Sequence, residues 1–293
     1  MSRYKISDLE KLSGVKAHTI RMWEKRYNMP TPFRTDTNIR YYDDLQLRKF
    51  LNVVLLKKAG NKISKIVKLS DYDFNSKISN LLQTGTLEIK EEILINQLIS
   101  SGLTYDEFGF EKAFSNSILS FGLLNAYKKV FYPMLVKVGL LWTISELSVS
   151  QEHFVTSLIR QKILTAIDAI KLSSNSEEKW VLFLPEGEIH DLGLLVASYA
   201  LRKRGHKVTY LGKNVKLEDL YEVSEHVNAT HYLSFVVRHN QRDVVNKYLS
   251  TMNSKFKSST CYICCDSSFK DDFNLFDNQN IISNFDEFLN LVQ

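Results

Sequence analysis

The last third of the chain, residues 178–293, constrains the fold most, because short apolar runs alternate there with amphipathic segments. Strands are expected at 180–184, 205–211, 231–234, 261–265 and 280–283, and helices at 192–204, 217–227, 243–252 and 285–291. Strands that alternate with helices are typical of a parallel, doubly wound, Rossmann-like α/β sheet. Ligands of such sheets bind beyond the carboxyl ends of the strands.

The preceding region, residues 89–173, has apolar residues at helical spacing. Breaks near Gly102, Gly122 and 145–148 divide it into four helices, at about 89–101, 105–121, 123–142 and 148–172. Four such helices predict a bundle, and residues 71–88 are expected to connect it to what precedes. A bundle alone indicates no function.

The first 70 residues carry most of the positive charge. They contain 16 Lys and Arg against 6 Asp and Glu, whereas the other 223 residues contain 22 basic and 27 acidic side chains. Such an asymmetry is typical of a nucleic-acid-binding domain joined to a part with another task.

The pattern inside this basic segment predicts an all-α helix-turn-helix with a β-wing. Gly14 permits a tight turn, and Ile20, Trp23 and Tyr27 give the second helix an apolar face. Basic and polar side chains remain outside for DNA bases and phosphates. The DNA-binding candidates are Lys16, His18, Thr19, Arg21 and Lys25 on this helix and Arg34, Arg40 and Tyr41 in the wing. The alternative is a solvated face, which is the better reading for any single lysine.

Residues 4–69 resemble the winged-helix DNA-binding domain of MerR-type transcriptional regulators, through the string YKISDLEKLSGVKAHTIRMWEKRY and the later RYYDDLQLRKFLNVVLLKKAG. The resemblance implies that the second helix enters the major groove of an operator. It also implies that the wing holds phosphates and that the protein binds double-stranded DNA as a dimer.

A second motif, Glu188-x-His190-x-x-Gly193, follows the first expected strand. A histidine at the carboxyl end of a strand faces the ligand crevice, and a neutral imidazole is a good ligand for a metal such as cobalt. Glu188 or Asp191 is expected to hold the other ring nitrogen, and Gly193 to let a helix approach closely. The alternative is a surface histidine without a role.

This motif is similar to the Asp/Glu-x-His-x-x-Gly signature of cobalamin-binding domains, and Trp142-x9-Glu152-His153 resembles the cap over the upper face of cobalamin. The order of domains is similar to that of the B12-dependent MerR-type photoreceptor repressors of the CarH/LitR kind. The resemblance implies His190 as lower cobalt ligand and Ser234 beside the nucleotide tail. It also implies Trp142, Glu152 and His153 around an adenosyl group, and a homo-oligomer (dimer or tetramer) whose assembly the cofactor controls and light reverses by breaking the cobalt–carbon bond.

Two positions depart from this pattern. Cys264 and Cys265 stand where the family has Gly-Gly beside the tail, which predicts a narrower pocket. Thr143 replaces the histidine that binds cobalt after illumination in the family. A zinc site at Cys261 and Cys264 lacks a second ligand pair, so buried strand cysteines are the better expectation.

Composition bounds the remaining options. No apolar run reaches the roughly 20 residues that a membrane span needs, and the N-terminus has no apolar signal core, so we expect a cytoplasmic protein. Two alternatives stay open beside a cobalamin-controlled regulator. One is a MerR-type regulator whose degenerate cobalamin domain works through protein partners or another ligand. The other is a corrinoid methyl carrier, which has no use for a basic winged helix.

Overall fold

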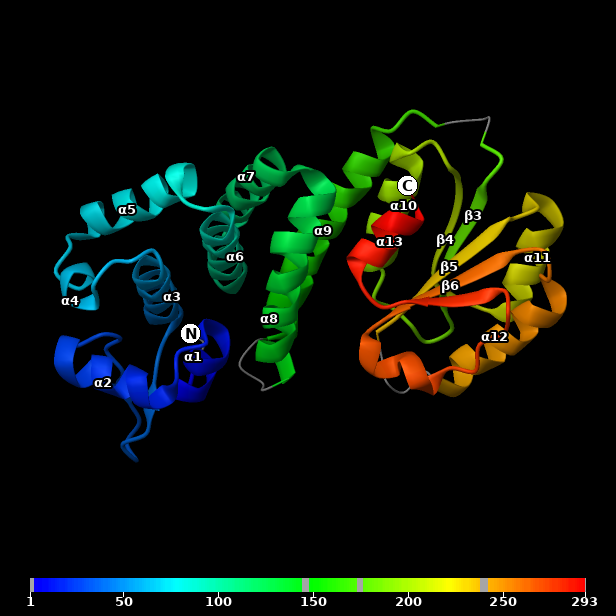
Figure 1. Cartoon of the computed structure of the whole chain (residues 1–293). Helices are drawn as coiled ribbons and strands as arrows, with labels where there is room; N and C mark the ends of the chain where they lie inside the picture. Colours follow the sequence, from blue (N-terminus) through cyan, green and yellow to red (C-terminus); the bar gives the residue numbers. More distant parts are fainter. Residues whose placement is uncertain (1–2, 144–147, 173–175, 238–241, 293) are drawn as a thin grey trace. The chain divides into compact units, whose positions relative to one another are not determined.

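The computed structural model describes residues 3–143, 148–172, 176–237 and 242–292 (Figure 1). The chain forms two compact units, Met1–Val155 and Thr156–Gln293. In the described part of the chain, no helix combines the length and the apolar character needed to cross a membrane.

The first unit begins with a helix-turn-helix. Gly14 ends helix α1 with a left-handed φ of 72°, which a residue with a side chain adopts only at a cost. Ile20 and Trp23 of α2 are buried, and Trp23 packs on Phe50 of α3 with 6.1 Å between ring centroids. The elements are α1 (Ile6–Ser13), α2 (Ala17–Tyr27), β1 (Phe33–Arg34), β2 (Arg40–Tyr41), α3 (Asp44–Lys58), α4 (Ile63–Ile66) and α5 (Asp71–Thr84).

Strands β1 and β2 form an antiparallel ribbon where the sequence predicted a wing, with Phe33 opposite Tyr41. Asp43 then caps α3, because its carboxylate accepts a 2.8 Å hydrogen bond from the amide of Gln46. The ribbon and the helix start are thus fixed by local contacts.

The rest of the first unit is helical. Its elements are α6 (Leu87–Leu103), α7 (Glu107–Ala126), the π-helical η1 (Tyr127–Phe131), α8 (Tyr132–Thr143) and α9 (Val149–Asp168), which continues into the second unit. Helix α6 packs against α7 and α8. Gly122 interrupts α7 with a non-helical φ of 70°, at the position where the sequence predicted a break. The side chain of Gln151 donates to the carbonyl of Leu103 at 2.7 Å and ties the start of α9 to α6.

The second unit is a five-stranded parallel sheet with strand order β4-β3-β5-β6-β7. Helices α10 and α13 cover one face and α11 and α12 the other (Figure 1). This confirms the parallel Rossmann-like sheet. The elements are β3 (Lys179–Pro185), α10 (Leu192–Lys203), β4 (Lys207–Val215), α11 (Leu217–Val227), β5 (His231–Val236), α12 (Arg242–Lys255), β6 (Thr260–Cys265), η3 (Ser267–Asp272), β7 (Gln279–Ile282) and α13 (Phe285–Leu291).

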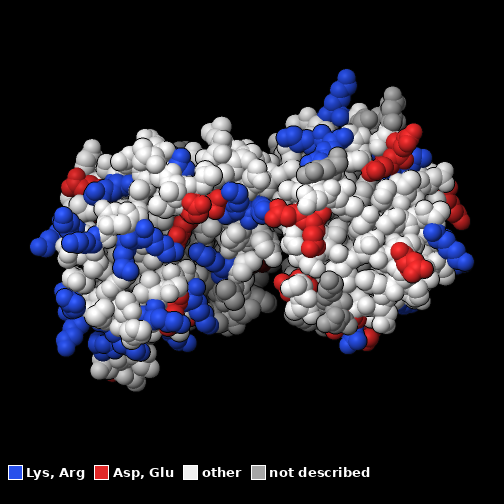
Figure 2. Space-filling model, viewed as in Figure 1, with Lys and Arg blue, Asp and Glu red and all other residues white. Residues whose placement is uncertain are grey.

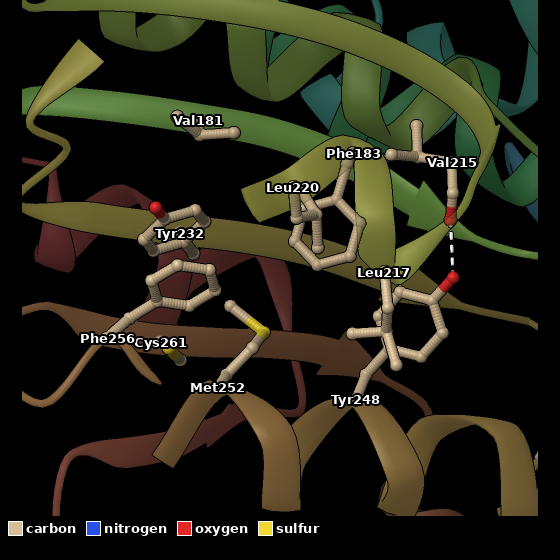
Figure 3. Close-up of a cluster of buried hydrophobic side chains, with 10 residues drawn as sticks. All are labelled: Val181, Phe183, Val215, Leu217, Leu220, Tyr232, Tyr248, Met252, Phe256 and Cys261. Atoms are coloured by element: carbon tan, nitrogen blue, oxygen red, sulfur yellow. Dashed lines mark hydrogen bonds between the residues drawn. The ribbon is translucent and has the colours of Figure 1, made fainter. Parts of the chain in front are cut away.

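Aromatic side chains fill the core between the sheet and helices α11 and α12 (Figure 3). Phe183 stacks on Tyr248, and Tyr232 stacks on Phe256 at a centroid distance of 4.9 Å. Fully burying one such ring contributes roughly 1.5–3 kcal/mol. The hydroxyl of Tyr248 donates to the carbonyl of Val215, which fixes the carboxyl end of β4 against α12.

Candidate cofactor site and nucleic-acid interface

The loop that carries His190 lies where the strand order of the sheet reverses. Strand β3 lies between β4 and β5, so the chain leaves β3 toward one side of the sheet and β5 toward the other. Ligands of such sheets bind at this switch point, beyond the carboxyl ends of the two strands. Residues 186–191, here called the His190 loop, follow β3 directly.

Neighbouring elements hold the backbone of this loop. The amide of Glu186 donates to the hydroxyl of Tyr248 at 3.2 Å, and the amide of Gly187 donates to the side-chain oxygen of Asn214 at 2.9 Å. Gly187 has a φ of 84°, so glycine is the residue suited to this turn. Helix α12 and strand β4 therefore position the loop.

Glu188 is fully buried and saturated with hydrogen bonds. One of its oxygens lies 2.5 Å from Nδ1 of His190 and accepts from the amides of Ile189 and His190 at 2.9 and 3.1 Å. The other accepts from the amide of Val237 at 3.0 Å, just beyond β5. Burial raises the pKa of this carboxyl, but the hydrogen bonds from His190 and Val237 outweigh it and lower the pKa to about 2. Glu188 is therefore an ionised acceptor that bridges the ends of β3 and β5.

This contact determines which nitrogen of His190 is available. An ionised carboxylate accepts only, so Nδ1 carries the proton and, in the neutral ring, Nε2 keeps its lone pair. No hydrogen-bond partner of Nε2 is found in the described part of the chain, and the His190 side chain is 47% exposed. The exposed apolar side chains of Ile189 and Val237 belong to the same loop ends. The arrangement offers one metal-ligating nitrogen beside apolar surface.

Asp191 is the carboxylate that does not contact the imidazole. It accepts three hydrogen bonds from Arg160 of α9, the shortest at 2.7 Å, and lies 3.6 Å from Nζ of Lys213 on β4. The sequence offered Glu188 and Asp191 equally as partners of His190, and the structure assigns that contact to Glu188.

Gly193 and Ser234 lie at the same end of the sheet. A Cβ atom on Gly193 would come within 2.8 Å of the Phe235 ring, so a side chain does not fit between α10 and β5. The buried hydroxyl of Ser234 has no hydrogen-bond partner among the residues that the structure describes, an uncommon and costly state. A polar atom of an inserted ligand would satisfy it.

The three cysteines are free thiols buried in β6. Burial raises the pKa of Cys261 to about 12 and of Cys265 to about 11, and it also raises the pKa of Cys264 well above its usual value. Within the described residues, no group of three or more His, Cys, Asp or Glu side chains is arranged for a metal ion. The cysteines pack as small apolar residues, as expected from the sequence.

Of the three residues expected above the cofactor, two have described side chains. Glu152 and His153 lie in the first turns of α9, with 3.5 Å between a carboxylate oxygen and Nε2, and the His153 side chain is largely exposed. Trp142 belongs to α8, but its side chain lies outside the described residues. That these three share a ligand with His190 stays a prediction.

The basic face of α2 is available to solvent. Lys16, His18, Arg21 and Lys25 are exposed, and Thr19 is half-buried. Figure 2 shows Lys and Arg side chains gathered over the N-terminal part of the first unit, whereas both signs of charge are visible on the second unit. A polyanion would meet an open cationic surface here.

The ribbon residues are held more firmly than those of α2. Nε of Arg40 lies 3.1 Å from Glu24, which also accepts from Tyr42. Arg34 donates to the side chain of Asn38 at 2.6 Å. Separately, the Tyr41 ring stacks on Phe33 and under the guanidinium of Arg3. Neither Arg3 nor Glu24 was among the residues expected from the sequence. The signal that could have pointed to Glu24 is that it is an acidic residue within an otherwise basic helix.

Two family descriptions match the chain. Residues 4–73 match the MerR HTH family regulatory proteins, and residues 94–165 match the B12 binding domain. The first match covers the helix-turn-helix, and the second covers most of α6 to α9.

Two curated relatives come from Myxococcus xanthus. The HTH-type transcriptional repressor CarH is 30% identical over 220 residues, which is 74% of this chain and 73% of the relative. The HTH-type transcriptional repressor CarA is 26% identical over 71% of this chain and 67% of its own length. Among solved structures, the Methanosarcina barkeri monomethylamine corrinoid protein matches with a TM-score of 0.55 at 14% identity, covering 68% of this chain and 96% of that one. This last likeness concerns the fold alone.

Proposed function

The chain belongs to the CarH family of HTH-type transcriptional repressors and is a DNA-binding, B12-dependent regulator rather than an enzyme, and we propose that cobalamin controls its operator binding by changing its oligomeric state. The DNA reader, its connector, the helical cap and the cobalamin domain correspond in this proposal to residues 1–70, 71–88, 89–173 and 178–293.

The contact between Glu188 and His190 carries the proposal. A histidine that binds a metal almost always donates its second ring nitrogen to a carboxylate or carbonyl, which fixes the ring and strengthens it as a ligand. Here a buried, ionised carboxylate takes Nδ1 and leaves Nε2 for cobalt. The strand switch point between β3 and β5 and the unpartnered Ser234 hydroxyl also fit a corrinoid with an inserted tail.

Each residue has a separate task in this proposal. His190 holds the lower side of the corrin, the exposed Ile189 and Val237 contact its apolar face, and Ser234 hydrogen-bonds the tail. Trp142, Glu152 and His153 cover the upper side of the ring, where an adenosyl group would lie. Bound adenosylcobalamin would supply a cobalt–carbon bond that light can break.

On the DNA side, we propose that α2 enters the major groove and that the β1–β2 ribbon acts as a wing on the phosphates. Arg21 and Thr19 would read bases, and Lys16, His18, Lys25, Arg34, Arg40 and Tyr41 would hold the backbone. Since operators of symmetric dimers repeat their half-sites, a homodimer or tetramer is the expected binding species.

The test is a spectrum and a binding curve on the same protein. We expect the full chain, mixed with adenosylcobalamin in the dark and desalted, to retain colour and to change its spectrum and sedimentation on illumination. Its affinity for a target operator should differ between apo, dark and illuminated protein. His190→Ala should alter the spectrum of the loaded protein. A colourless desalted protein would reject the cofactor, and an unchanged His190→Ala spectrum would reject the ligand.

A regulator that has lost its cofactor is the second candidate, and Cys264 and Cys265 favour it. Both thiols are buried in β6, on opposite faces of the sheet, at the strand end where the tail is expected. Equal operator affinity with and without cobalamin, in dark and light, would support this candidate.

A further inference from the structure

Asp191 occupies a helix start but does not cap the helix. It is the residue before α10 (Leu192–Lys203), a position where an aspartate usually accepts a hydrogen bond from the first amides of the helix. Here its carboxylate makes no such bond. The Asp191 side chain is therefore free to make contacts outside α10.

Those contacts join three parts of the second unit. The carboxylate accepts from Nε of Arg160 at 3.2 and 3.3 Å and from its terminal nitrogen at 2.7 Å. The ammonium group of Lys213 lies 3.6 Å from Oδ2 of Asp191, which also accepts the longer bond from Nε of Arg160. Helix α9, strand β4 and the His190 loop therefore meet at one carboxylate.

The pair between Asp191 and Arg160 is shielded from water. The side chain of Asp191 is 9% exposed and that of Arg160 is 31% exposed. Buried charges pair with strict geometry, because leaving either one alone is costly. Arginine also forms a planar fork that fixes a carboxylate in direction as well as in distance. Burial and the charge of Asp191 both raise the pKa of the neighbouring Tyr210 hydroxyl, so this hydroxyl stays neutral and adds no charge to the pair.

Arg160 lies on the same helix as two of the residues that are expected above the cofactor. Helix α9 is continuous from Val149 to Asp168 and carries Glu152 and His153 in its first turns, and Arg160 two turns later. Asp191 directly follows His190. The pair thus connects the helix that carries two predicted upper-side residues with the loop that carries the predicted lower ligand.

We propose that Asp191 and Arg160 are positioning residues that hold the His190 loop to helix α9 and thereby keep the imidazole at cobalt. The inference rests on the proposed function, because it assumes that His190 binds a corrinoid. The Glu188 contact sets which nitrogen is free, and the Asp191 pair sets where the loop places it.

The experiment compares full-length variants loaded with cobalamin. Asp191→Asn removes the charge but keeps the shape, and Arg160→Met removes the fork but keeps the aliphatic stem. We expect each to weaken cobalamin affinity about tenfold, because a displaced loop would weaken the bond from His190 as much as the loss of an outer partner of a metal ligand does. Arg160→Lys should recover part of the loss. The double variant should lose little more than either single one.

A second readout separates positioning from folding. Cobalamin reduced to cobalt(II) in nitrogen-15-labelled protein reports a coordinated protein nitrogen through its electron paramagnetic resonance splitting. At saturating cofactor, we expect the signal of histidine ligation to fall in Asp191→Asn and Arg160→Met. Arg204→Met is the matched control, because Arg204 lies at the opposite end of α10 from Asp191 and donates to the carbonyl of Val292. It should keep the parent affinity and signal.

The outcomes distinguish this inference from the function on which it rests. If the parent protein lacks the histidine signal, the proposed function fails. If the parent shows it, and Asp191→Asn and Arg160→Met bind and ligate like the parent, the positioning pair is refuted. If Arg204→Met loses as much as these two variants, the effect is general destabilisation and the pair is refuted as well.

Discussion

Helix α2 and the His190 loop use charge in opposite ways. On α2, Arg21 and Lys25 are exposed, and so is Lys16 just before it, whose ammonium group lies 3.2 Å from Glu10. In the loop, Glu188 and Asp191 are buried, and hydrogen bonds and ion pairs satisfy both. The charges of α2 are available to a binding partner. The charges of the His190 loop are paired within the protein, and we propose that these pairs hold the His190 side chain in place.

The difference follows from the partners that we propose. A nucleic acid is a repeating polyanion, so exposed cations gain from counterion release and tolerate changes of register. A metal centre needs one nitrogen at one place, which demands rigid, paired neighbours. Whether the charges are exposed or buried therefore distinguishes α2, which would attract a polyanion, from the His190 loop, which would position one metal ligand.

The strongest test of the comparison changes the buried carboxylate that holds the imidazole. Glu188→Gln keeps the shape but turns an amide donor toward either the amide of Val237 or the ring nitrogen of His190. We expect cobalamin affinity to fall by roughly 10- to 100-fold, measured by spectrophotometric titration. Glu186→Gln, at an exposed neighbouring position, is the control. An equal loss of cobalamin affinity in this variant would contradict a special role of the buried carboxylate.

A second test removes one exposed charge. Arg21→Ala should weaken operator binding by about 2 kcal/mol, roughly thirtyfold, and relax specificity at one base pair if Arg21 contacts a base. Fluorescence anisotropy at several salt concentrations measures both effects. Lys207→Ala, an exposed cation of the second unit, lowers the net charge equally and should leave binding unchanged. An equal loss of operator affinity in Arg21→Ala and Lys207→Ala would mean that the net charge of the protein, and not the position of Arg21 on α2, determines binding.

A third test concerns packing beneath the loop. Gly193→Ala would drive its Cβ against the ring of Phe235, and such overpacking costs about 1–3 kcal/mol. Denaturant unfolding should show the loss, and Phe235→Leu in the same chain should restore part of it. Gly139→Ala in α8 has open space around it and should be neutral or stabilising. An unchanged stability of Gly193→Ala would show that α10 moves away easily.

The smallest effect should come from His231, whose ring stacks on Trp180 at 4.3 Å at the opposite end of the sheet. Burial lowers its pKa, Glu178 raises it and His206 lowers it, and the net shift is downward. The unfolded chain then binds the proton more readily, so stability is complete above about pH 6.5 and falls as the pH drops below it. His231→Phe should flatten this profile between pH 7 and 5 in pH-dependent melts. A profile as steep as that of the parent would assign the slope to other groups.

The strands and the His190 motif were predictable because each depends on local patterns, such as the apolar run before Pro185. Other features depend on residues distant in sequence. The choice between Glu188 and Asp191 as partner of the ring depends on Arg160, which is 31 positions away from Asp191. The π-helical turn at Tyr127–Phe131 was not predicted, because its apolar residues show no spacing that distinguishes it from an α-helix. The extension of β4 to Val215 was not predicted either, because it passes through left-handed residues at Gly212 and Asn214.

The anchoring of Glu186 and Gly187 by Tyr248 and Asn214 has a consequence for kinetics. A loop already formed before its guest arrives loses little conformational entropy on binding. Capture should then proceed at a rate that depends weakly on temperature and is limited by encounter and by threading of the tail. Slow release would follow from the same rigidity, so that a brief supply of vitamin would leave a long-lived occupied receptor.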